Sequence, residues 1–133
     1  MNNLLKNVFG SLFFFGVVLL GHFSLSASEK KHPLRLIHAD RLSRETIDNR
    51  VRQTLHGKVK FQQEKTTIRC DVVTQFVGED PITLIGHVQI NEPTRSLSAD
   101  TVYFYEKIRK QVAVGNVVSI TNSDTTTAYR ITY

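Results

Sequence analysis

Hydrophobic and polar residues alternate along much of the chain. Around Gly57 the apolar residues Leu55, Val59 and Phe61 alternate with polar ones, and a similar alternation surrounds Gly86. A period of two places one set of side chains on an apolar face and the other in water, as in a β-strand. The segments 68–77 and 97–105 are rich in β-branched and aromatic residues, which also favour strands.

Turn-forming residues separate these strands, at 48–49, 78–81, 91–93 and 122–124. Two segments, 43–55 and 106–114, also fit a helix with apolar residues four apart. We favour hairpins there, because the equivalent segments of the middle part of the chain are strand-like and interrupted by proline. Short connections favour antiparallel neighbours, so the sequence predicts an all-β fold of stacked antiparallel hairpins.

The chain repeats itself every 29 residues. Gly57, Gly86 and Gly115 are separated by this interval, and a valine follows each glycine by two residues. A small residue follows each glycine by 13, at Cys70, Ala99 and Ala128. Cys70 therefore stands where alanine stands in the other units, and we expect a small buried side chain rather than a reactive thiol.

The repeated glycines and aspartates have structural interpretations. A glycine at the same phase of each strand indicates a bulge or a close approach of backbone. Asp40, Asp71 and Asp100 recur with the repeat. A residue that recurs in every unit favours a structural role over that of a general base.

The N-terminus has the order of a secretory signal: Lys6, an uncharged apolar run at 8–20, and small residues at 24–28. We expect residues 1–28 to be a signal peptide, with a retained membrane anchor as the alternative. Either one predicts that the domain at 36–133 is exported, in the periplasm or attached to the inner membrane.

Composition narrows the function further. The 133 residues are 41% hydrophobic and 22% charged, with a net charge of +5, as in one folded domain. Basic residues gather in the first unit, where a solvated surface and contact with anionic head groups are both open interpretations. The export signal argues against nucleic acid as a partner. No nucleophile motif or metal-ligand cluster stands out, so we expect no enzyme activity, no metal and no cofactor.

The repeat resembles the OstA-like family of lipopolysaccharide transport, which includes LptA, LptC and the N-terminal domain of LptD. The matching residues pair Ala39-Asp40 with Gly57-Lys-Val59, Cys70-Asp71 with Gly86-His-Val88, and Ala99-Asp100 with Gly115-Asn-Val117. The resemblance implies an open, twisted β-jelly roll that takes the acyl chains of lipopolysaccharide and stacks head to tail with other OstA-like modules. Tyr129 replaces the expected aspartate, and the fourth unit breaks off at Tyr133, so we expect a fragment or a short variant.

The apolar face of the hairpins is the candidate binding site. If two facing layers close, these side chains are core; if the layers splay, they line a groove for acyl chains. A closed β-repeat scaffold without a lipid and an LptC-like anchored member are the alternatives to a lipid-binding bridge module. The candidate groove residues are Leu55, Val59, Phe61, Ile68, Leu84, Val88, Ile90, Leu97 and Val117.

Overall fold

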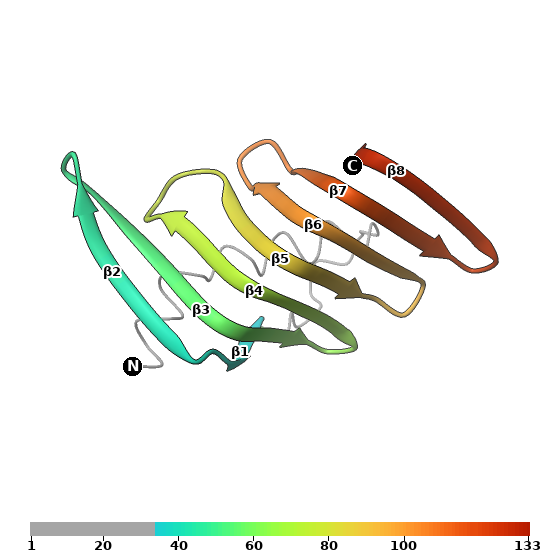
Figure 1. Cartoon of the computed structure of the whole chain (residues 1–133), viewed down its shortest axis with the longest axis horizontal. Coiled ribbons are helices and arrows are strands. Elements are labelled where there is room, and N and C mark those ends of the chain that lie inside the picture. Colours follow the sequence, from blue (N-terminus) through green and yellow to red (C-terminus); the bar gives the residue numbers. More distant parts are fainter. Residues whose placement is uncertain (1–33) are drawn as a thin grey trace, which may run out of the picture.

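The computed structural model describes residues 34–133, which form eight β-strands and no helix (Figure 1). The apolar segment predicted as a signal at 1–28 lies outside these residues. Within the described part of the chain, no helix is long and apolar enough to cross a membrane. The strands are β1 (Arg35–His38), β2 (Arg41–Ile47), β3 (Arg50–Gln63), β4 (Thr66–Phe76), β5 (Ile82–Asn91), β6 (Arg95–Tyr105), β7 (Lys110–Thr121) and β8 (Asp124–Thr132).

All eight strands belong to one antiparallel sheet, in the order β1-β3-β4-β5-β6-β7-β8 (Figure 1). Strand β2 also pairs with β3, so that β1 and β2 share the length of this long strand. The predicted antiparallel hairpins are confirmed. The segments that also fitted a helix form β2 and part of β3, and the turn and first half of β7.

Strands β3, β5 and β7 each carry a bulge at the repeated glycine. Gly57, Gly86 and Gly115 have φ angles of +82°, +85° and +85°, and the residue after each also has a positive φ. Pairing with the neighbouring strand shifts by one residue at each of these points. A Cβ atom on any of the three glycines would come within 3 Å of an aspartate carboxylate. The predicted bulge and the predicted close approach therefore both occur.

The line of bulges bends the sheet until its two halves face each other. Tyr133 pairs with Gln111 near the start of β7, yet its hydroxyl donates a hydrogen bond to Ser119 Oγ near the other end, at 3.1 Å. Residues 111 and 119 of a straight strand would lie about 26 Å apart, far beyond the length of a tyrosine side chain. Strand β7 therefore folds back at its bulge, and the core forms between the two halves of the sheet.

Candidate functional site

The structure places all nine candidate groove residues on the inner face of the folded sheet. None is more than 4% exposed, and all belong to one hydrophobic cluster that spans both halves. Their contact with a ligand stays a prediction. They are Leu55, Val59, Phe61, Ile68, Leu84, Val88, Ile90, Leu97 and Val117.

The same cluster contains five apolar residues that the sequence analysis did not assign to the inner face. In β4 and β6 the burial pattern changes phase at the repeated aspartate, so that Cys70 and Val73, three residues apart, are both buried. Simple alternation puts one of the two outside. The added residues are Val73, Ile82, Val102, Phe104 and Ala113.

One margin of the inner face carries three buried glutamines, with the apolar residues Ile82 and Phe104 of β5 and β6 in the same row. Each glutamine lies two residues beyond the last apolar residue of its strand's inner row. They are Gln53 on β3, Gln75 on β4 and Gln111 on β7, which are 0%, 6% and 1% exposed. Gln53 and Gln75 are directly paired across β3 and β4. We call these three residues the glutamine margin. The sequence analysis missed them because it takes glutamine as a surface residue.

The opposite margin holds an ion pair. Arg95 donates to Glu92 Oε1 at 2.8 Å, and its guanidinium lies 4.3 Å from the centre of the Tyr133 ring. The Glu92 side chain is 2% exposed, and this burial raises the pKa of its carboxyl. Because Tyr133 also pairs with Gln111, this residue connects the two margins.

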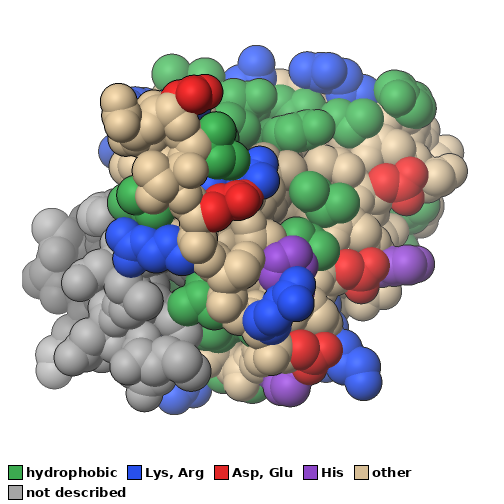
Figure 2. All heavy atoms as spheres, turned by 60° about the vertical axis from the view of Figure 1, so that its left-hand side comes forward, with side chains coloured by type: hydrophobic (Ala, Val, Ile, Leu, Met, Phe, Trp, Pro, Cys, Tyr) green, Lys and Arg blue, Asp and Glu red, His purple; other side chains and the backbone are tan. Residues whose placement is uncertain are grey.

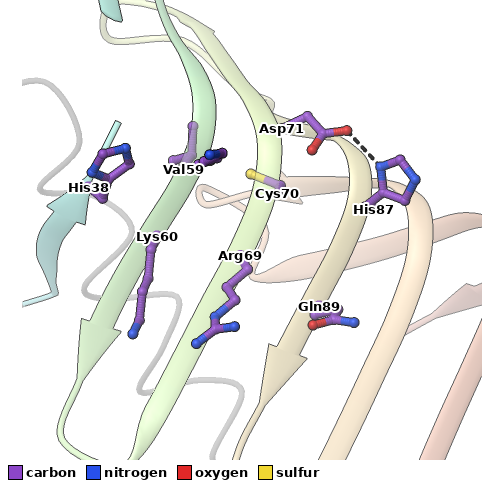
Figure 3. Close-up of a pocket in the computed structure, with 9 residues that line it drawn as sticks. His38, Val59, Lys60, Arg69, Cys70, Asp71, His87 and Gln89 are labelled. Atoms are coloured by element: carbon purple, nitrogen blue, oxygen red, sulfur yellow. Dashed lines mark hydrogen bonds and ion pairs between the residues drawn. The ribbon is translucent and has the colours of Figure 1, made fainter. Parts of the chain in front are cut away.

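A cleft of about 510 Å³ lies on the outer face, beside the first bulges (Figure 3). Lys60, Arg69 and Gln89 stand next to one another on β3, β4 and β5, and the Lys60 and Arg69 side chains extend in the same direction (Figure 3). At the other end of the cleft, His87 Nδ1 lies 2.7 Å from Asp71 Oδ2, and this hydrogen bond raises the pKa of His87. The lining is His38, Lys58, Val59, Lys60, Arg69, Cys70, Asp71, His87 and Gln89.

The basic residues of the first unit do not act as one patch. Arg50 binds both carboxylate oxygens of Glu79 at 2.9 Å, and this contact lowers the pKa of Glu79. Arg52 pairs with Glu45 on β2. Figure 2 shows acidic, basic and hydrophobic side chains interspersed on this side of the molecule. These contacts favour the interpretation of a solvated surface for these charges. Cations also gather around the cleft on the outer face.

The described residues contain no group of three or more His, Cys, Asp or Glu side chains that could hold a metal ion. Cys70 is buried, and burial raises the pKa of its thiol to about 12. At neutral pH this sulfur is a protonated thiol, which is a poor nucleophile and a poor metal ligand.

A single antiparallel sheet, folded about a line of bulges around an apolar inner face, defines an open β-jelly roll. The chain belongs to the OstA-like protein family, whose sequence model matches residues 31–133. No curated protein matches the sequence.

A solved structure with the same fold is the crystal structure of LptH from Pseudomonas aeruginosa. That protein is described as the LptA homologous periplasmic component of the conserved lipopolysaccharide transport device. The TM-score is 0.60 and the identity is 21%, over 77% of this chain and 76% of that chain. The match confirms the predicted jelly-roll fold. At 21% identity the likeness establishes the fold alone and does not by itself imply a shared function.

Proposed function

We propose that this chain is a periplasmic module that shields the acyl chains of lipopolysaccharide during transport to the outer membrane. The observation that carries this proposal is the inner face, where nine predicted side chains from both halves of the sheet form one apolar surface. Family membership and the likeness to LptH support it. The role is one of binding and transfer, without catalysis.

The apolar surface supplies enough energy for the task. Each methylene removed from water contributes about 0.8 kcal/mol, so a chain of about a dozen carbons gains roughly 10 kcal/mol before the costs of ordering. A lipid held this strongly leaves only for a similar surface. Transfer therefore runs between neighbouring modules, and its direction comes from an energy source elsewhere.

The proposal includes the location and the partners of the chain. A signal at 1–28, cleaved or retained as an inner-membrane anchor, delivers the domain to the periplasm. Other OstA-like modules pair head to tail with the two edges of the sheet, because edge strands present unpaired N–H and C=O groups. Strand β8 forms one edge, and β1 and β2 form the other.

Binding of a fluorescent acyl probe to delipidated protein tests the proposed site. We expect saturable binding that Leu84→Asp weakens at least tenfold, because an acyl chain cannot solvate a buried carboxylate. Ile85→Asp is the matched control: Ile85 is the next residue of β5 and is 40% exposed, so binding is retained. Circular dichroism reports whether each variant folds.

If Leu84→Asp unfolds the protein, Val88→Phe replaces it, since a larger side chain fills the inner space without adding charge. Folded protein that ignores both the acyl probe and lipopolysaccharide would contradict the proposal. That outcome would favour the closed β-repeat scaffold, in which the same residues are only core.

A further inference from the structure

The glutamine margin carries buried amide groups without partners. Both amide atoms of Gln53 and both of Gln111 are buried and make no hydrogen bond, and the same is true of Gln75 Oε1. Only Gln75 Nε2 is bonded, to the carbonyl oxygen of Glu79 at 3.3 Å. An apolar side chain at these positions would avoid the penalty of burying an unpaired amide. These amides therefore destabilise the free protein, and they point to a ligand that pairs with them.

The position of the margin indicates which part of a ligand it meets. Gln53 lies two residues from Leu55 along β3, and Gln111 lies two residues from Ala113 along β7. Two residues of a strand span about 7 Å, so the amides border the apolar rows directly. Gln111 also pairs through its backbone with Tyr133, whose hydroxyl bonds Ser119 on the other half of β7. An amphiphile with its chains on the apolar rows places its polar end here.

The chemistry of the amides narrows the ligand further. A carboxamide donates through N–H and accepts through its oxygen, but it carries no charge. It suits an ester or amide carbonyl, or a hydroxyl close to one. A phosphate or carboxylate would need a cation, and Arg95 at the opposite margin is already paired with Glu92. The margin therefore fits the neutral linkage of an acyl chain rather than an anionic head group.

We propose that Gln53 and Gln75, paired across β3 and β4, form a binding subsite for the ester or amide linkage that joins an acyl chain to its head group. Gln111, three strands away on β7, serves a second linkage of the same kind. This inference rests on the proposed function, since it assumes that the apolar rows hold acyl chains. It adds that the site selects acylated amphiphiles over plain hydrocarbons. It also explains why buried polar residues stand at the edge of an otherwise apolar surface.

Two probes of equal chain length test the subsite on the delipidated full chain: a pyrene-labelled alkane and a pyrene-labelled N-alkyl amide. Gln53→Met, Gln111→Met and their combination keep the side-chain length and remove the amides. The control is Gln89→Met, because Gln89 is exposed in the outer cleft. We expect the double variant to bind the alkane as the unaltered protein does and the amide probe about tenfold more weakly. We also expect its urea midpoint to rise.

The outcomes separate the two proposals. If the double variant binds the amide probe as tightly as the unaltered protein, or if its urea midpoint falls, the subsite is refuted and the acyl-binding role stands. If the unaltered protein binds neither probe, the acyl-binding role fails and the subsite fails with it. A loss of amide-probe affinity in Gln89→Met as well would assign the effect to the protein surface and also refute the subsite.

Discussion

Each bulge glycine is covered by an aspartate side chain, and this contact explains why the two residue types recur together. Asp71 covers Gly86 and also accepts a hydrogen bond from the ring of His87, the other residue of the bulge. Asp100 covers Gly115, and Asn116 Nδ2 donates to its Oδ2 at 2.9 Å. At all three bulges the aspartate thus fills the space that a Cβ atom would take, and at the second and third it also binds the second bulge residue. Its repeated role is to hold the bend of the sheet.

Replacing one bulge glycine should cost more than its backbone angle alone explains. For Gly86→Ala we expect a loss of about 2–4 kcal/mol in the free energy of unfolding, from the positive φ and from contact with Asp71. Gly78→Ala is the matched control, because Gly78 has a φ of +80° but open space around it. It should lose only about 1 kcal/mol. Urea denaturation measures both.

Adding Asp71→Ala to Gly86→Ala tests the cause. If contact with the aspartate contributes, the double variant recovers part of the loss, although it also loses the bond to His87. Equal losses in Gly86→Ala and Gly78→Ala would show that only the backbone angle matters.

At the level of the strands, the repeat predicted the hairpins and the bulges because both depend on local residue types. Alternation also placed Leu55, Val59 and Phe61 correctly, since β3 keeps its phase through the bulge. It did not assign Val73 and Val102 to the inner face, because β4 and β6 change phase opposite the bulges of their neighbours. Pairing with the neighbouring strand imposes this change of phase, so it cannot be predicted from the residues of one strand alone.

The polar parts of the inner face were harder to predict than the apolar parts. Gln53 and Gln111 lie in phase with Leu55 and Ala113, but glutamine is a surface residue in most folds. The pairing of Glu92 with Arg95 at a turn also has the form of a surface contact, yet the Glu92 side chain is 2% exposed. Burial of such residues depends on how the sheet folds over, and this folding cannot be predicted from the repeat alone.

The central strand β4 offers a direct report on its burial through Cys70. Because burial raises the pKa of this thiol to about 12, almost no thiolate exists at pH 8. We expect a chromogenic disulfide reagent to react about 10³-fold more slowly with folded protein than with protein in concentrated urea. The control is Gln89→Cys in a Cys70→Ala background. Gln89 is exposed, so its cysteine should react freely, and alanine already stands at Ala99, the position equivalent to Cys70 in the next unit. Fast reaction of Cys70 in the folded protein would show that β4 opens readily.

The whole molecule presents two unlike edges at opposite ends of the sheet (Figure 1). Strand β8 has no net charge, since Asp124 and Arg130 are its two charged residues, and Tyr129 stands 77% exposed where the earlier units have an aspartate. The opposite edge carries the exposed cations Arg35, Arg41 and Arg44 on β1 and β2. Head-to-tail pairing joins unlike edges, so it brings β8 of one copy beside a basic edge of the next. Tail-to-tail pairing would join β8 to another β8.

Two substitutions of opposite charge at one position distinguish these assemblies. Thr127 is exposed on β8, and Thr127→Lys would face the basic edge of the next copy in a head-to-tail stack. Like charges across paired strands disfavour association by about 0.2–1 kcal/mol, so we expect self-association to be weaker by a factor of about 1.4 to 5. Thr127→Glu should leave association unchanged or strengthen it by a similar factor, and added salt should reduce both effects. Sedimentation velocity across a concentration series measures them. Equal weakening by lysine and glutamate would contradict head-to-tail stacking. In a β8–β8 contact, either substitution places two like charges at the same interface, so both would weaken it.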